Sequence, residues 1–120
     1  MDIKTFENLY IWQESKNIFI DLYSIFNKSN FRDYFFKDQI LRASLSISNN
    51  IAEWFERETN KEFVRFLYIA KWSCWEVRNM LIIWKELWYF DDNLYKINSE
   101  KLYKISWWLQ NLIKKSYIEK

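Results

Sequence analysis

The segment from residue 63 to residue 88 carries apolar side chains at alternating steps of four and three: Phe63, Leu67, Ala70, Cys74, Val77, Leu81, Trp84 and Trp88. This spacing places one continuous apolar line along a helix, and it is typical of helices that pack in antiparallel bundles. We therefore expect a helix from about Lys61 to Leu87. Cys74 lies on the apolar line, so we expect a small core residue there rather than a nucleophile.

Three further segments show helical spacing, and short polar breaks separate all four. We expect these helices at about residues 5–27, 32–58 and 92–117. The breaks supply candidate N-caps, namely Thr5 for the first helix, Thr59 or Asn60 for the third, and Asp91 or Asp92 for the fourth. Short connections make consecutive helices antiparallel neighbours. The sequence thus predicts an all-α protein, an up-down-up-down antiparallel four-helix bundle formed as one domain by residues 1–120.

The segment from Gln39 to Arg57 differs from the other helical segments. Many of its residues are small or β-branched, and its apolar residues form two lines instead of one. Two apolar lines imply contact with more than one neighbour, so we expect a homo-oligomer in which a second subunit covers one line. Asn50 and Glu53 lie three residues apart on one helical face. We expect them to hydrogen-bond across the bundle or the subunit interface and to fix its register.

The chain contains one cysteine and no histidine. This excludes an intramolecular disulfide and any histidine-based triad, and it removes the usual zinc ligand sets. A carboxylate-only metal site stays open, with Glu53, Glu56, Glu58 and Glu62 as its candidates. The Glu-x-x-His pattern of di-iron bundles cannot occur. We expect no enzyme activity, no catalytic residue, no metal, no cofactor and no small-molecule substrate.

Apolar runs in the chain are short. The run from Met80 to Trp84 spans five residues, far below the roughly 20 residues that cross a bilayer as a helix. The first residues carry charges where a signal peptide has an apolar stretch. We expect a cytoplasmic protein with no membrane partner.

The formal charge of +2 hides an uneven distribution. Residues 61–120 hold eleven Lys or Arg against seven Asp or Glu, whereas residues 1–60 hold seven against nine. A basic half is compatible with binding to phosphate groups of RNA or DNA. The candidate contacts are Arg42, Arg57, Lys61, Arg65, Lys71, Arg78, Lys114 and Lys115. The alternative is that these cations form salt bridges within or between subunits, because several glutamates lie within helical reach.

The central part of the chain resembles the family of 23S rRNA intervening-sequence proteins, also called four helix bundle proteins or ribosomal protein S23. The matching residues are Arg42, Ala43, Ser46–Ile47, Asn50–Glu53, Arg57 and Lys61–Leu67. The early stretch from Leu9 to Gln13 and the stretch from Lys85 to Leu87 are also similar to the family. The resemblance covers essentially the whole chain.

This resemblance implies a four-helix bundle, commonly assembled as a ring-like homopentamer, with no known enzyme activity. Some members of the family are encoded within insertions in rRNA genes. A related accessory protein of diversity-generating retroelements binds nucleic acid and a reverse transcriptase. The resemblance therefore implies an oligomeric protein that binds RNA or DNA. The alternative is an accessory protein whose partner is another protein, such as a reverse transcriptase.

Glycine is absent and tryptophan occurs eight times, although ordinary usage of about 7% predicts roughly eight glycines. Trp54, Trp72 and Trp88 stand where the family usually has glycine. Trp12 matches a family tryptophan. Further candidates for exchanged residues are Trp75, Trp84, Trp107 and Trp108. We hypothesise that UGA codons meaning glycine were translated as tryptophan. A true Trp88 has to end its helix differently from glycine or extend it.

Overall fold

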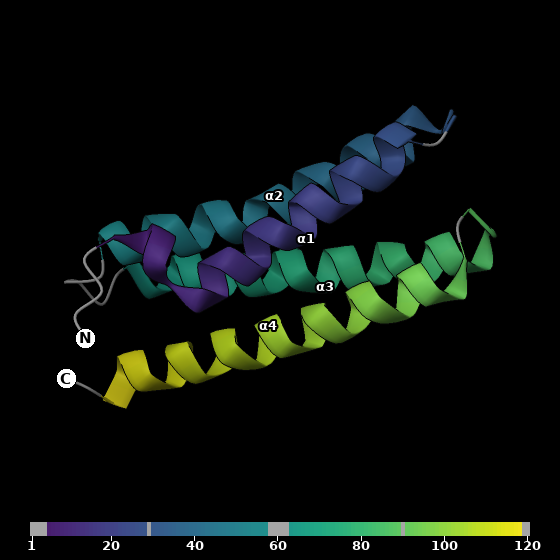
Figure 1. Ribbon diagram of the computed structural model, residues 1–120. Helices are drawn as coiled ribbons and strands as arrows, with labels where there is room; N and C mark the ends of the chain where they lie inside the picture. Colours follow the sequence, from purple (N-terminus) through teal and green to yellow (C-terminus); the bar gives the residue numbers. More distant parts are fainter. Residues whose placement is uncertain (1–4, 29, 58–62, 90, 119–120) are drawn as a thin grey trace.

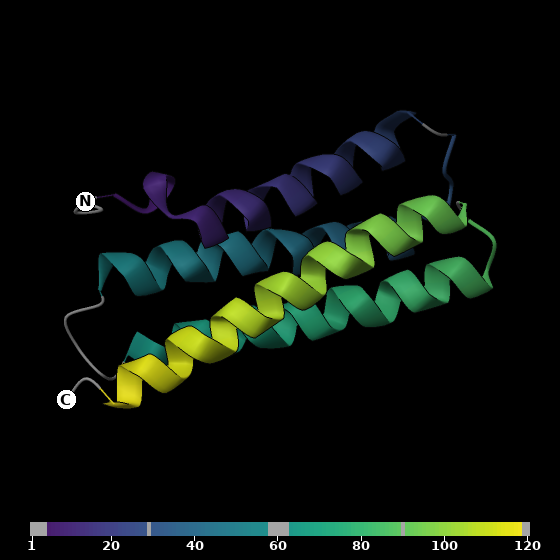
Figure 2. The same cartoon turned by 60° about the horizontal axis from the view of Figure 1, so that its bottom comes forward.

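The computed structural model describes residues 5–28, 30–57, 63–89 and 91–118. It is an antiparallel four-helix bundle in which the chain runs up, down, up and down (Figures 1 and 2). Its helices are α1 (Tyr10–Lys28), α2 (Tyr34–Glu56), α3 (Val64–Glu86) and α4 (Asp92–Ile118), with a short 3-10 helix, η1 (Phe6–Asn8), before α1. The bundle is elongated, 48 × 24 × 22 Å. The predicted fold class is confirmed.

Neighbours along the chain are also neighbours in space. The most extensive packing joins α2 to α3, followed by α3 to α4 and α1 to α2, whereas α1 and α4 meet over a shorter length. Small side chains explain the close α2–α3 contact, because Ala43, Ser44 and Ser48 are all buried in α2. The start of α1 and the end of α4 lie at the same end of the bundle (Figure 1).

The apolar line predicted for the third helix forms much of the core. Its six members from Leu67 to Trp84 are buried, because α3 packs on both α2 and α4. The two ends of the line depart from the prediction. Phe63 is half-buried and precedes the helix. Trp88 lies beyond the last turn and is 88% exposed, so the prediction that it belongs to the apolar line was wrong.

Aromatic rings close the end of the bundle where α1 meets α2 and α3 meets α4. Phe31 lies between Phe26 and Tyr89, with ring centroids 4.9 Å from each. Phe26 also contacts Trp84 at 5.7 Å, and Phe36 contacts Tyr89 edge-on at 5.5 Å. Edge-to-face and tilted pairs at these distances stabilise more than their buried area alone. This cluster fixes the two connections relative to each other.

The helix starts show which predicted caps form. Asp91 accepts a hydrogen bond from the Leu94 amide at 3.0 Å, so it caps α4 as predicted. Thr5 precedes η1 and makes no side-chain cap bond. Leu9 adopts an extended conformation, and α1 begins only at Tyr10. The predicted start of the first helix was therefore wrong. The third-helix caps, Thr59 and Asn60, lie outside the described residues.

The end of α3 contradicts one expectation about Trp88. The helix stops close to the predicted Leu87, but Trp88 neither extends it nor ends it in an unusual way. Trp88 has φ 58°, the left-handed conformation that glycine usually supplies at this position. For a residue with a Cβ this conformation costs about 1–2 kcal/mol.

Among the described residues, none of the helices is both long enough and apolar enough to cross a membrane.

Candidate functional site

The side of α2 turned away from the bundle is amphipathic. Helical spacing places Phe35, Arg42, Leu45 and Asn49 on this side, and all four are exposed. Phe35 is 81% exposed and Leu45 is 40% exposed. The opposite side of α2 is buried against α1 and α3. We call the exposed side the α2 outer face. Of the second apolar line that the sequence predicts, which consists of Leu41, Leu45, Ala52 and Phe55, only Leu45 lies on this face, and the other three side chains are half-buried.

A polar chain joins α2 to α3 inside the bundle. Asn50 Nδ2 donates to the Ser46 carbonyl oxygen at 2.8 Å and to Ser46 Oγ at 3.0 Å. Ser73 Oγ of α3 also donates to Ser46 Oγ, at 2.8 Å. Asn50 therefore bonds within its own helix, and the link across the helices belongs to Ser73. That Asn50 fixes register across the bundle or the subunit interface stays a prediction.

Glu53 also bonds within its own helix. Its carboxylate pairs with Arg57 Nε at 3.2 Å, one turn further along α2, and both side chains are about half-exposed. An exposed pair of this kind contributes only a few tenths of a kcal/mol to stability. Any role of Glu53 between subunits remains a prediction.

Cations and aromatic rings alternate at the end of the bundle where α3 begins. The Arg57 guanidinium lies 5.6 Å from the Phe63 ring centroid. Phe63 stacks on Phe66 at 6.2 Å with an angle of 16° between the rings. The Arg65 guanidinium lies 5.2 Å from the Phe66 ring. Stacking holds both guanidinium groups in place. The Arg57 Nε–H group is bound by Glu53, so an anion would be bound by the terminal N–H groups of Arg57 and by the guanidinium of Arg65. We call this set the Arg–Phe cluster.

Two other predicted phosphate contacts bind α4 instead. Lys71 Nζ donates to Gln110 Oε1 of α4 and lies 5.2 Å from the Trp75 ring. The Arg78 guanidinium lies 3.8 Å from the ring of Tyr103, also in α4. Both side chains are half-buried. Their packing between helices gives them a structural role that the sequence analysis offered as the alternative.

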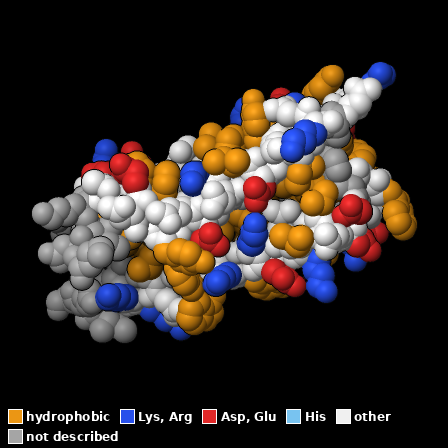
Figure 3. Space-filling view, in the orientation of Figure 1, with side chains coloured by type: hydrophobic (Ala, Val, Ile, Leu, Met, Phe, Trp, Pro, Cys, Tyr) orange, Lys and Arg blue, Asp and Glu red, His pale blue; other side chains and the backbone are white. Residues whose placement is uncertain are grey.

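The remaining predicted contacts differ in their surroundings. Arg42 lies on the α2 outer face and Lys114 near the end of α4, and both are exposed. Lys115 lines a cavity near the same end of α4. Lys61 lies outside the described residues. On the face shown in Figure 3, basic and acidic side chains are interspersed among apolar ones, so this face carries no broad basic patch.

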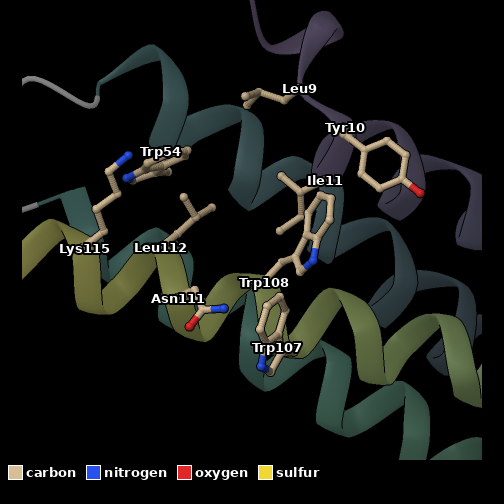
Figure 4. A pocket seen from close by; sticks show the side chains of 9 residues that line it. All are labelled: Leu9, Tyr10, Ile11, Trp54, Trp107, Trp108, Asn111, Leu112 and Lys115. Carbon is tan, nitrogen blue, oxygen red and sulfur yellow. The ribbon is translucent and has the colours of Figure 1, made fainter.

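A cavity of about 360 Å³ lies where α1 and α4 meet over their shorter contact. It is lined by Leu9, Tyr10, Ile11, Trp54, Trp107, Trp108, Asn111, Leu112 and Lys115 (Figure 4). The rings of Tyr10 and Trp108 lie 4.8 Å apart at its edge. The lining is mostly apolar, and its polar groups are the Asn111 amide, the Lys115 ammonium, the Tyr10 hydroxyl and the indole N–H groups.

Cys74 is protected from ionisation by its burial. Burial raises the pKa of its thiol from 9.0 to about 12, despite the opposing effects of the nearby Ser106 hydroxyl and of the Arg78 charge. A thiol with this pKa is protonated at neutral pH, and the thiolate is the nucleophilic form. Cys74 therefore acts as the small core residue that its position predicts. Among the described residues, three or more acidic or cysteine side chains nowhere gather as metal ligands would.

Residues 7–111 match the pattern of the 23S rRNA-intervening sequence protein family. The chain belongs to this family. The match includes the segment from Gln39 to Arg57 and the Arg–Phe cluster. Among curated proteins, none matches the chain.

One solved structure with the same fold is the crystal structure of a protein of unknown function from the S23 ribosomal protein family of Bacteroides thetaiotaomicron. The two chains superpose with a TM-score of 0.78 at 21% identity, over 87% of this chain and 95% of the other. This likeness shows the fold of a 23S rRNA-intervening sequence protein. Together with the family match it confirms the resemblance seen in the sequence.

Sequence reasoning missed the partners that position the functional side chains. Phe63 was expected on the core seam, and Phe66 was not singled out, yet the two rings hold Arg57 and Arg65. A signal was present, because an arginine and two phenylalanines recur within four residues at 63–66. The Ser46–Ser73 contact joins residues 27 positions apart, and no local pattern in one helix predicts its partner in the next.

Proposed function

We propose that this protein is a non-enzymatic homo-oligomer that binds the phosphate backbone of RNA or DNA. Its subunits associate through the α2 outer face, and a ring of five is the form that the family resemblance implies. Nucleic acid contacts the end of each subunit that carries the Arg–Phe cluster. The observation that carries the proposal is the pair of guanidinium groups stacked on adjacent rings at this end.

Exposed apolar side chains support association of subunits. Phe35 and Leu45 are exposed on α2, and Ile82, Ile83 and Leu87 are 48%, 39% and 49% exposed near the end of α3. The beginning of α2 and the end of α3 lie at the same end of the bundle (Figure 1). Apolar surface of this extent on adjacent helices is typical of a protein–protein interface. Arg42 and Asn49 between the apolar residues would give the contact polar specificity.

The position of the basic groups supports contact with nucleic acid. The end of α2, the start of α3 and the end of α4 meet at one end of the bundle (Figure 1). Arg57, Arg65 and Lys114 come from these three helix ends. In a ring, copies of this end would repeat around one rim. Phosphate contacts from several subunits then add together, which raises affinity without base-specific contacts.

The chemistry of the chain supports a binding role over catalysis. The sequence contains no histidine, and the pKa of the Cys74 thiol is raised to about 12 by burial. The cavity beside Trp54 is apolar. Stacked arginines and exposed lysines bind anions.

A binding assay with matched variants tests the nucleic-acid contact. The protein would be titrated into labelled single-stranded and structured RNA, and into DNA, at several salt concentrations. We expect binding that weakens with salt, and a log–log salt slope reduced by about 2 when Arg57→Ala and Arg65→Ala are combined. Arg78→Ala is the control, because Arg78 packs on Tyr103. No binding at low salt would contradict the proposal.

A protein partner is the second candidate function. The exposed Phe35 and Tyr34, 81% and 64% exposed at the first turn of α2, favour it. A reverse transcriptase encoded beside the gene would identify the protein as an accessory subunit. The two purified proteins would then form a complex in which Phe35→Ser lowers affinity by at least tenfold. A complex that is insensitive to this change would argue against the α2 outer face as the docking surface.

A further inference from the structure

The last turn of α3 has the hydrogen bonds of a glycine-terminated helix. The Trp88 amide donates to the Lys85 carbonyl at 3.1 Å, and the Tyr89 amide donates to the Trp84 carbonyl at 3.2 Å. Leu87, the C-cap residue of α3, has φ −86° and ψ 0°. Two hydrogen bonds donated by the amides of the first and second residues after the C-cap residue define the Schellman motif. The motif requires a left-handed residue at position 88, and Trp88 supplies it with φ 58°.

Tryptophan is a poor residue for this position. Left-handed backbone is uncommon outside glycine, with asparagine and aspartate as the usual exceptions, and for a bulky residue it is a genuine outlier. A favourable contact of the ring could offset the strain, but the Trp88 side chain is 88% exposed. Among the described residues, Trp88 is the only non-glycine residue with positive φ. The backbone conformation at position 88 therefore favours glycine, although the side chain there is that of tryptophan.

The other tryptophans fall into recognisable groups. Trp72, Trp75 and Trp107 are 55%, 48% and 63% exposed, so large rings stand in solvent on α3 and α4. Trp84 is 1% exposed within the aromatic cluster. Trp12 packs against the core and lies 5.1 Å from the Phe6 ring. Trp54 and Trp108 also pack against the core, so a glycine would leave a hole at these two positions as well as at positions 12 and 84.

We infer that position 88 is glycine in the protein that the source cells make, and that positions 72, 75 and 107 are glycine as well. Their codons are UGA, read as glycine in those cells, whereas Trp12 and Trp84 have UGG codons. The complete absence of glycine beside eight tryptophans has the same explanation. Trp84, a candidate on sequence grounds, is excluded by its burial.

Two observations on the native material test the inference directly. The gene gives the codons, and peptide mass spectrometry of the protein from its source cells gives the residues. We expect UGA and glycine at positions 72, 75, 88 and 107, with UGG and tryptophan at positions 12 and 84. A UGG codon and a tryptophan-containing peptide at position 88 would overturn the inference.

Variants of the tryptophan-containing chain test the backbone strain at position 88 independently of the gene sequence. Trp88→Gly relieves the backbone strain, whereas Trp88→Ala removes the same ring and keeps a Cβ. We expect Trp88→Gly to raise the folded-to-unfolded ratio about tenfold over Trp88→Ala, a rise of roughly 4 °C in melting temperature. Trp84→Gly lowers the melting temperature, because it empties a buried site. Equal stability of the two position-88 variants would refute the glycine argument there.

Discussion

Asp33 connects two parts of the chain that lie far apart in sequence. Its Oδ1 accepts the Phe36 amide at 3.0 Å and caps α2, and its Oδ2 accepts the Tyr89 hydroxyl at 2.8 Å. One carboxylate therefore holds the start of α2 against the residue that follows α3. The sequence predicts a helix start near this position, but the contact with Tyr89 spans 56 residues, and no local pattern predicts it.

Replacing Asp33 separates the two roles of its carboxylate. Asp33→Ala removes the cap and the Tyr89 bond, and we expect it to lower the free energy of unfolding by about 1–2 kcal/mol. Tyr89→Phe removes only the second bond and should cost less. Urea denaturation of both variants measures the difference. Asp91→Ala, which removes the exposed cap of α4, is the control for capping alone. Equal losses in Asp33→Ala and Tyr89→Phe would show that the cap contributes nothing.

Cys74 gives a pH prediction with a defined sign. Burial raises the pKa of the folded thiol to about 12 from 9.0. Between these values the unfolded chain loses a proton that the folded protein keeps, so this group lowers stability as pH rises from 9 toward 12. Cys74→Ala removes this part of the pH dependence. Denaturation at pH 8 and pH 10.5 would reveal it, and parallel losses in both proteins would contradict the assignment.

The same burial controls reactivity at neutral pH. A thiol that is protonated and 0% exposed reacts with neither iodoacetamide nor a disulfide reagent. We expect labelling of Cys74 only in denaturant, at a rate that follows unfolding. Rapid labelling of the folded protein, detected by mass spectrometry, would contradict the buried core position.

At the scale of helices, the α2–α3 pair is held by small residues and one polar link. Close approach is possible because serines and alanines replace larger side chains on the buried side of α2. Ser44 and Ser48 bond back to carbonyls of α2, at 3.0 and 3.3 Å, so their hydroxyls are satisfied without a partner helix. The hydroxyl of Ser73 in α3 donates a hydrogen bond to the hydroxyl of Ser46 in α2, and this bond links the two helices. Along the α2–α3 contact, small side chains thus allow close packing while the serine hydroxyls keep hydrogen-bond partners.

The polar link predicts a measurable difference between two serine variants. Ser73→Ala removes the donor to Ser46, and we expect a loss of about 1 kcal/mol in the free energy of unfolding. Ser44→Ala removes only a bond within α2 and gains helix propensity, so its effect should be close to zero. Chemical denaturation of both variants gives the comparison. A Ser44 variant less stable than the Ser73 variant would contradict this account of the seam.

Helix boundaries show where sequence reasoning about elements succeeds and fails. Periodicity predicts α3 well, because six residues of its apolar line are buried in one core. It places the start of the first helix too early. Residues 6–8 do form a turn of 3-10 helix, but Leu9 breaks away with ψ 123°. Nothing in the local sequence, which contains no glycine or proline, marks that break. Leu9 packs against the core, so tertiary contact decides the geometry.

The exposed side of α3 depends on the identity of its tryptophans. With rings at Trp72 and Trp75, this side offers a large apolar surface. With glycine at both positions the rings disappear, and a neighbouring helix could approach the backbone closely. The non-tryptophan apolar residues Phe35, Leu45, Ile82 and Ile83 remain exposed in either case. The proposed association of subunits therefore rests on these four residues and on Leu87, which is also exposed.

At the scale of the whole molecule, the fold follows from sequence and the partners do not. Four amphipathic segments with short connections predict the bundle, and the family match agrees. The structure divides the candidate phosphate-binding cations into two groups. Lys71 and Arg78 pack on α4, whereas Arg57 and Arg65 stack on phenylalanines at one end. Charge alone could not separate these groups, because side-chain packing across helices decides which cations face solvent.

A charge introduced on the α2 outer face tests the proposed interface. Leu45→Glu places a carboxylate on the exposed side of α2, where a second subunit would have to desolvate it. We expect dissociation into folded monomers with an unchanged helical circular dichroism spectrum. Ile20→Glu is the matched control, because Ile20 is 50% exposed on α1 and lies outside the proposed interface. An intact oligomer in the Leu45 variant would move the interface away from α2.

The mass of the protein in solution tests the central claim most directly. The chain has a mass of 15.1 kDa, and size-exclusion chromatography with light scattering measures the mass of the assembly without reference to its shape. At micromolar concentration we predict one species at a whole-number multiple of the chain mass, with five as the number that the family resemblance implies. A single monomeric species at that concentration would contradict an account in which the protein works as an assembled ring.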